Sequence, residues 1–128
     1  MPQYMLLIYT PTDTQPPADD PGVDISRWLA FGESLRDAGV LVGSNRLHET
    51  EMATTVRVRD GETLVTDGPF AETNEYLAGY FLLDCPNLDA ALEAAARVPH
   101  IHYGTVEVRP IMVGAPTVEP DGEPAARA

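Results

Sequence analysis

The sequence predicts an α+β domain with a ferredoxin-like, split β-α-β plan and an inserted β-hairpin. The patterned segments run in the order strand, helix, strand, hairpin, strand, helix, strand. Two β-α-β halves of this kind build an antiparallel sheet with both helices on one face. The 128 residues, 44% of them hydrophobic and 22% charged, are enough for one core of this size.

The first half of this plan begins with residues 3–9, a short apolar run that is typical of a buried strand. The proline-rich residues 10–22 predict an irregular loop. Asp24 can cap a helix that Gly39 ends, and residues 40–42 return as a short strand. The helical residues that we expect to face the core recur at helical spacing: Ile25, Trp28, Leu29, Gly32 and Leu35.

The inserted hairpin is predicted by a strict alternation in residues 54–59, Thr-Thr-Val-Arg-Val-Arg, which indicates a strand with one polar face. Asp60-Gly61 is a strong signal for a tight hairpin turn, and residues 62–66 supply the returning strand.

The second half contains an apolar, aromatic strand at residues 76–83 and a helix that Asn87 caps and Pro99 ends. Residues 105–113 form the last strand. The inner face of this helix is expected to carry Leu88, Ala91, Leu92 and Ala95. We expect residues 1–113 to form one domain and the proline-rich residues 114–128 to form a mobile tail.

Apolar side chains on both faces of the first strand indicate a symmetric homodimer. Met5, Leu7 and Tyr9 point to one side of the strand, and the equally apolar residues between them point to the other. Helices cover one side only, and a large apolar face left in water is rare in monomers. Two sheets packed face to face would cover the other side.

The charge of the chain argues against nucleic acid as a partner. The net charge is −12 and all eight basic residues are arginines, whereas phosphate backbones are held by clustered basic side chains. The longest apolar run, residues 5–9, is too short for a bilayer, which needs about 20 residues. With no signal-peptide pattern at the start, we expect a cytoplasmic protein that does not bind membranes.

Residues 66–73, Thr-Asp-Gly-Pro-Phe-Ala-Glu-Thr, resemble the signature of the DGPF group in the YCII-related family of small bacterial proteins. The resemblance covers most of residues 2–113 and implies a dimeric α+β barrel. Related barrels include lactone isomerases, a dehydrochlorinase and haem- or quinol-handling monooxygenases, so the fold does not fix a reaction. The flanking segments that share it are residues 4–9, 38–41, 54–61, 79–84, 88–92 and 106–110.

The chain departs from this family at one position. Some YCII-related members carry a histidine in the first helix, proposed to act with an aspartate as an acid–base pair. Residues 24–38 contain no histidine, and Trp28 takes the inward position.

Asp67 and Phe70 in this signature have a structural and a functional interpretation. An Asp-Gly-Pro sequence makes a tight turn, with Asp67 bonded to backbone amides and Phe70 filling the core. In the functional interpretation the turn lies at the mouth of a cleft between sheet and helices. There Asp67 would act as a general acid or base, with Trp28 and Phe70 as an apolar wall that raises its pKa. Tyr9 would complete the ligand pocket with these two residues.

The three histidines and the strand arginines offer further candidates. His100 and His102 would share one face of an extended segment, but two ligands do not make a metal site. The simpler interpretation is that both are ordinary loop histidines. In the alternative interpretation, His102 is a proton shuttle. Glu107 and Arg109 form ion pairs on a polar sheet face, or Arg109 binds the carboxylate of a small acid.

Two functions follow from this pattern. The first is a protein that binds a compact aromatic or carboxylated ligand and carries out cofactor-free acid–base chemistry of the isomerase or lyase kind; the sequence has no glycine-rich phosphate loop. The second is a regulatory interaction module that binds an extracytoplasmic-function sigma factor, since genes for such factors neighbour many DGPF members. An interaction module would fill the cleft with Trp28, Phe31 and Phe70, whereas a ligand binder would keep it open.

Overall fold

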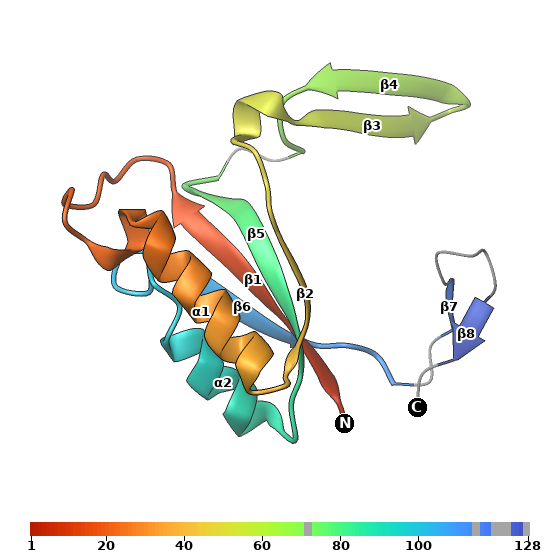
Figure 1. Ribbon diagram of the computed structural model, residues 1–128. Coiled ribbons are helices and arrows are strands. Elements are labelled where there is room, and N and C mark those ends of the chain that lie inside the picture. The colour runs from red at the N-terminus through yellow and green to blue at the C-terminus, as the bar shows by residue number, and fades with distance from the viewer. Residues whose placement is uncertain (71–72, 114–115, 119–123, 127–128) are drawn as a thin grey trace.

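The computed structural model describes residues 1–70, 73–113, 116–118 and 124–126, and its main unit is a four-stranded antiparallel sheet (Figure 1). The strand order is β2-β5-β1-β6. Both helices, α1 (Ile25–Asp37) and α2 (Leu88–Ala96), cover the same face (Figure 1). The predicted ferredoxin-like α+β arrangement is therefore confirmed. The strands are β1 (Gln3–Pro11), β2 (Leu41–Arg46), β5 (Glu75–Asp84) and β6 (Thr105–Pro110).

A β-bulge interrupts the pairing of the two central strands. Ile8 lies opposite Gly79 and Tyr9 lies opposite Leu77, so Ala78 is the extra residue in β5. The carbonyl of Ala78 accepts a hydrogen bond from the backbone N–H of Leu47, 2.8 Å away. This bond holds the chain beside β5 one residue beyond the end of β2.

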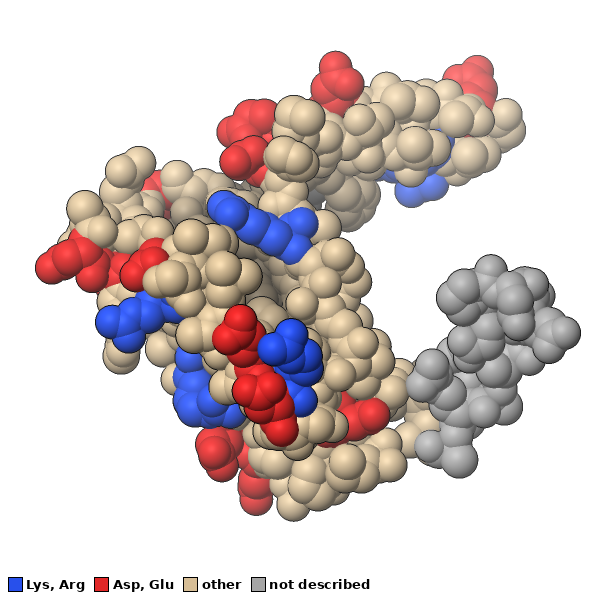
Figure 2. Space-filling view, viewed as in Figure 1, with Lys and Arg blue, Asp and Glu red and all other residues tan. Residues whose placement is uncertain are grey.

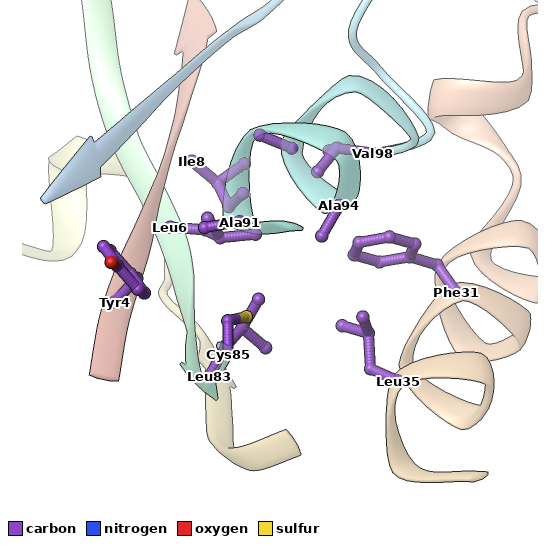
Figure 3. Close-up of a cluster of buried hydrophobic side chains, with 11 residues drawn as sticks. Tyr4, Leu6, Ile8, Phe31, Leu35, Leu83, Cys85, Ala91, Ala94 and Val98 are labelled. Atoms are coloured by element: carbon purple, nitrogen blue, oxygen red, sulfur yellow. The ribbon is translucent and has the colours of Figure 1, made fainter. Parts of the chain in front are cut away.

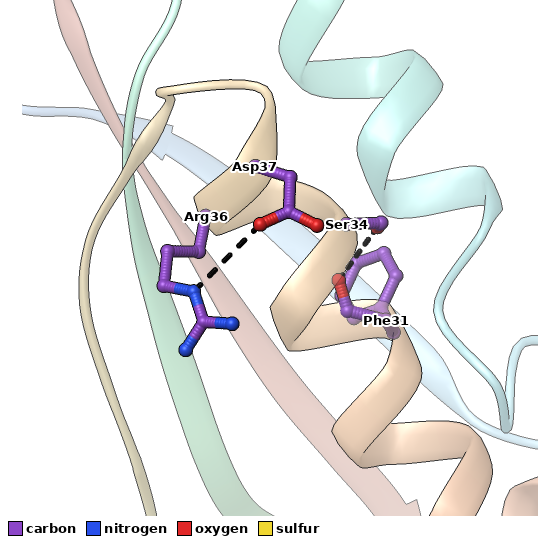
Figure 4. A network of polar contacts seen from close by, with 4 residues as sticks. All are labelled: Phe31, Ser34, Arg36 and Asp37. Atoms are coloured by element: carbon purple, nitrogen blue, oxygen red, sulfur yellow. Dashed lines mark hydrogen bonds and ion pairs between the residues drawn. The ribbon is translucent and has the colours of Figure 1, made fainter.

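Both helices begin where the sequence predicts, because side-chain caps satisfy their first N–H groups. The Asp24 carboxylate accepts from the N–H of Ser26 at 3.0 Å, and the Asn87 side chain accepts from the N–H of Ala90 at 2.9 Å. Near the end of α1, the Ser34 hydroxyl donates to the Phe31 carbonyl at 2.7 Å (Figure 4). Gly39, with a φ of 76°, then takes the left-handed conformation that ends the helix.

The core lies between the helices and the sheet (Figure 3). Leu6, Leu83 and Leu35 are almost completely buried. Phe31 is the second large α1 residue in this core, and the prediction that Leu29 faces it is wrong, since Leu29 is 62% exposed.

The predicted inner face of α2 is also partly wrong. Leu88 and Leu92 are 46% and 47% exposed, whereas Ala91, Ala94 and Ala95 are buried. The small alanine side chains are the part of the helix that packs against the sheet, and this turns the two leucines toward the surface.

The inserted hairpin, β3 (Thr54–Arg59) and β4 (Glu62–Asp67), forms a separate two-stranded sheet. Asp60 and Gly61, with φ of 52° and 79°, make the predicted tight turn. The hairpin projects from the sheet on the side away from the helices (Figure 1). Nearly all its residues are exposed. Two short 3-10 helices, η1 (Pro21–Val23) and η2 (Thr50–Met52), precede α1 and β3.

The last strand of the main sheet ends at Pro110, three residues earlier than predicted. Its neighbour β1 begins at Gln3, whose carbonyl accepts the final bond from the N–H of Ile111 at 2.9 Å. Beyond that point β1 offers no further partner. Residues 116–118 and 124–126 pair as the short strands β7 and β8. The rest of the segment predicted to be a mobile tail falls outside the described residues.

Candidate functional site

A cavity of about 700 Å³ opens between α1 and the β2–β5 side of the sheet, and we call it the α1 cleft. Its walls come from η1, α1, β2 and β5, together with the loop that follows α2. The space-filling view shows a hollow along α1, with a basic group at its upper edge (Figure 2). Volumes of this order are typical of small-molecule sites.

One side of the α1 cleft is apolar. Ile25 and Leu29 lie one helical turn apart on α1 and line the cavity, which explains why both remain exposed instead of entering the core. Gly32 continues this line, and a side chain added there would first meet the Phe81 ring at 4.0 Å. Glycine at this position therefore keeps the space between α1 and β5 open.

Trp28, which the sequence predicts in the wall of a cleft between sheet and helices, lines this cavity. Its indole N–H donates to the carbonyl of Gly22 at 2.9 Å, which ties α1 to the preceding 3-10 helix. The ring meets His100 edge-on, with 5.2 Å between the ring centres. A partly buried indole with a fixed orientation is a suitable wall for an aromatic ligand.

His100 is the buried polar residue of the cleft wall and is 1% exposed. Its Nε2 lies 2.8 Å from the carbonyl oxygen of Tyr9. Since a carbonyl only accepts, Nε2 carries the proton, and Nδ1 of the neutral ring has an acceptor lone pair. Nδ1 is buried and has no hydrogen-bond partner among the described residues.

Two glycines make room for the imidazole. A Cβ on Gly104 would lie 2.3 Å from ring atoms of His100, and a Cβ on Gly22 would lie 2.7 Å from its backbone. Tyr103 packs edge-on against the ring at 5.6 Å. The ring is therefore held in one place by its neighbours.

Burial lowers the pKa of His100 below its usual value of 6.5. The hydrogen bond to Tyr9 and the charges of Asp20 and Glu75 act in the opposite direction and are weaker. The imidazole is therefore neutral at pH 7, and Nδ1 keeps its acceptor lone pair. Burial also raises the pKa of the neighbouring Tyr103 phenol, which stays protonated at the same pH.

Both charge signs are present in the cleft wall. Arg36 extends from α1 and Arg46 from β2, on two sides of the cavity, and Glu33 and Glu49 also line it. Arg36 lies 3.9 Å from the Asp37 carboxylate, with both side chains exposed (Figure 4). Arg46 forms no ion pair with any described residue. The wall therefore carries two guanidinium groups and two carboxylates, and a guanidinium group can bind the carboxylate of a ligand.

The other predicted site residues lie outside the α1 cleft. Asp67 ends β4 and is exposed, and Phe70 is 71% exposed beneath the guanidinium of Arg57, 5.1 Å from its ring centre. His102 is exposed in the loop before β6. Arg109 lies on the opposite face of the sheet, 3.4 Å from Glu107.

Tyr9 contributes to two regions of the molecule. Its carbonyl holds His100, whereas its side chain lines a second cavity of about 700 Å³ beneath the hairpin, together with Met52, Pro69 and Leu77. Of the predicted set, the α1 cleft is therefore lined by Trp28, while the Tyr9 carbonyl holds a residue of its wall.

Sequence reasoning missed His100 and the two cleft arginines. His100 was interpreted as an ordinary loop histidine, because nothing in the local sequence shows that Tyr9, 91 positions earlier, holds its ring. The glycines at 22 and 104 were the available signal, since both positions have no space for a side chain. No group of three or more metal-ligating side chains occurs within the described part of the chain.

The fold and the cleft define a small ferredoxin-like α+β protein with one helix-flanked cavity, an apolar wall and a buried neutral histidine. The YCII-related domain matches residues 3–114, and the chain belongs to this family. A protein of Rhizobium meliloti (strain 1021), described as uncharacterized, is 45% identical over 82 residues. That alignment covers 62% of this chain and 66% of the relative, slightly less than two thirds of its length.

Family membership fits the observed fold and assigns no reaction. Within the residues that the structure describes, no helix has both the length and the apolar character needed to cross a bilayer.

Proposed function

We propose that the protein binds a compact aromatic or carboxylated molecule in the α1 cleft, where cofactor-free acid–base chemistry of the isomerase or lyase kind can follow. The open cavity carries this proposal. An interaction module was expected to fill it with Trp28, Phe31 and Phe70, yet Phe31 lies in the core and Phe70 on the hairpin. Only Trp28 of these three lines the space, and it leaves about 700 Å³ open.

The chemistry of the wall indicates the class of ligand. Trp28 and Leu29 offer an apolar surface for a ring, while Arg36 and Arg46 offer guanidinium groups to a carboxylate. An aromatic acid such as benzoate satisfies both. We therefore propose Arg46 as the anion-binding residue in place of Arg109, whose guanidinium pairs with Glu107 on the other face.

A variant that fills the cavity tests this proposal. Gly32→Leu adds a side chain directly into the α1 cleft, in a helical position where leucine is also more favourable than glycine. Ala30→Leu, on the exposed side of the same helix, is the matched control. Isothermal titration with benzoate should show binding to the parent and to Ala30→Leu, and none to Gly32→Leu; equal binding by all three would contradict a site in this cleft.

The anion-binding role can be separated by charge removal. Arg46→Gln should weaken benzoate binding about tenfold and leave the binding of uncharged phenol unchanged, because only benzoate carries the carboxylate. Arg109→Gln serves as the control on the opposite face. If only Arg109→Gln weakened benzoate binding, Arg109 would be the anion-binding residue, as the sequence first predicted.

A catalytic role for Asp67 or His102 stays a prediction, and neither residue lines the α1 cleft of its own protomer. Once a substrate is identified, Asp67→Asn with undiminished turnover would contradict a catalytic role for Asp67.

We further propose that the protein is a homodimer that buries the open face of the sheet, meaning the face without helices. Met5, Leu7 and Leu82 lie on that face and are only half-buried. An apolar sheet face of this kind is normally covered, and a second copy covers it with a self-complementary surface.

Binding of an extracytoplasmic-function sigma factor is the second candidate function, and the surface of α2 favours it. Leu88 and Leu92 lie one turn apart and are about half exposed. Together with the net charge of −12, this surface suits a basic, amphipathic partner helix. Failure of the two proteins to co-purify at low ionic strength would count against this candidate.

A further inference from the structure

The buried acceptor of His100 has no function in the fold. A buried polar atom without a hydrogen bond costs on the order of 1–3 kcal/mol, and such atoms are rare in native structures. Neither the bond from Nε2 to the Tyr9 carbonyl nor the packing of the ring against Trp28 and Tyr103 uses Nδ1. Nδ1 is therefore an unused acceptor in a residue that lines a cavity.

The geometry around the ring fixes what this acceptor can recognise. The bond from Nε2 to the Tyr9 carbonyl fixes the tautomer, and the ring packs edge-on against Trp28 and Tyr103. A neutral imidazole nitrogen of this kind accepts a hydrogen bond and cannot donate one. A carboxylate, which has no proton to give, gains nothing there, whereas a hydroxyl group does.

We propose that Nδ1 of His100 is the hydrogen-bond acceptor of the α1 cleft and selects ligands that carry a hydroxyl group. This inference rests on the proposed function and narrows its ligand to a hydroxylated aromatic acid. The carboxylate binds Arg46 and the hydroxyl group binds His100.

Access to Nδ1 requires a small movement of one neighbour. Nδ1 is buried, and Trp28 is the half-buried ring that packs edge-on against the imidazole. A shift of this indole is the movement by which we propose that a hydroxyl group gains access to Nδ1. Trp28 is the only tryptophan of the chain, so its fluorescence reports this movement directly.

A pair of matched probes tests the inference on the full chain. The parent should bind 4-hydroxybenzoate about tenfold more tightly than 4-methoxybenzoate, a difference of about 1.4 kcal/mol, and the Trp28 fluorescence should change more with the first. His100→Phe should bind the two probes equally, while His102→Phe should keep the preference. Discrimination that persists in His100→Phe, or a parent that does not discriminate, overturns the inference.

A measurement on the parent alone covers the case in which His100→Phe does not fold. In the imidazole ¹⁵N spectrum, the Nδ1 signal of His100 should move when 4-hydroxybenzoate is added and stay in place with benzoate. A stationary signal with both, while titration shows both bound, overturns the role of His100 and leaves the proposed function standing. If neither compound binds the parent, the proposed function fails, and the inference fails with it.

Discussion

The two faces of the central sheet consist of the same strands, but this chain covers only one of them. On the helix side, Leu6 and Ile8 are 0% and 3% exposed. On the open side, their neighbours Met5 and Leu7 are only half-buried. The hairpin is the extreme case, with Val56, 61% exposed, in a two-stranded unit that has no helix over it. Apolar alternation thus predicts a strand, but it does not predict which other segment or molecule packs on each face of the sheet.

The largest expected effect is a difference in stability loss between two neighbouring positions of β1, one on each face of the sheet. Leu6→Ala removes a fully buried side chain and should lower the free energy of unfolding by about 3 kcal/mol. Leu7→Ala, the same substitution on the open face, should cost less than about 1 kcal/mol at low protein concentration. Urea unfolding measures both, and equal losses would contradict the difference between the faces.

The second effect concerns what covers the open face. Leu7→Asp places a charge there and should convert the proposed homodimer into a folded monomer, seen by analytical ultracentrifugation as half the mass. Leu88→Asp makes the same change on the exposed surface of α2 and should leave the dimer intact. A parent that sediments as a monomer at all concentrations would show that the open face is not a dimer interface.

A third, smaller effect comes from the polar residue on the covered side. Burial lowers the pKa of His100 in the folded chain below 6.5. Between that lowered pKa and about pH 6.5, His100 is protonated in the unfolded chain and neutral in the folded chain. Stability should therefore fall as the pH drops below about 6.5, by at most about 1.4 kcal/mol per pH unit, and this contribution should be constant above it.

Two variants isolate that pH dependence from the carboxylates. His100→Phe should flatten the curve between pH 7.5 and 5 when unfolding by urea is compared with the parent. His102→Phe, which replaces an exposed histidine two positions away, should leave it unchanged. A slope that survives in His100→Phe would assign the proton to another group.

The smallest effect belongs to the hairpin. Arg57→Ala removes the contact of the guanidinium with the Phe70 ring, a contact that contributes about 0.5–1 kcal/mol at an exposed site. Amide hydrogen exchange in β3 and β4 should accelerate a few-fold, with no change in β1 or β5. The guanidinium of Arg59, on the same strand, donates to the Val58 carbonyl. Arg59→Ala should have less effect, and equal acceleration would contradict the importance of the aromatic contact.

Local patterns were sufficient to predict most of the fold. The caps at Asp24 and Asn87, the turn at Asp60-Gly61 and the β-α-β order each depend on neighbours within a few residues. The predictions of core residues were wrong where an apolar side chain could be accommodated in two different apolar environments. Leu29 fits a core stripe as well as a cleft wall, and only the position of α1 over the sheet distinguishes the two.

The site was harder to predict because it joins segments far apart in the chain. Trp28 could be identified, since it lies on the inward side of a predicted helix. His100 acquires its tautomer from Tyr9 and its burial from the tight packing at Gly22 and Gly104. No spacing in the sequence encodes that contact, and the nearby His102 looks equivalent until the loop is folded.

The bulge at Ala78 has a consequence for how this molecule can diversify. Its carbonyl holds Leu47 beside β5, and the chain leaves the sheet there for the hairpin and returns at β5. The hairpin between β2 and β5 is therefore a projecting segment that this hydrogen bond anchors to the sheet at its N-terminal end. Residues 50–70 contribute nothing to the wall of the cavity beside α1, so this part can be lengthened, trimmed or exchanged for another recognition loop while that cavity keeps its shape.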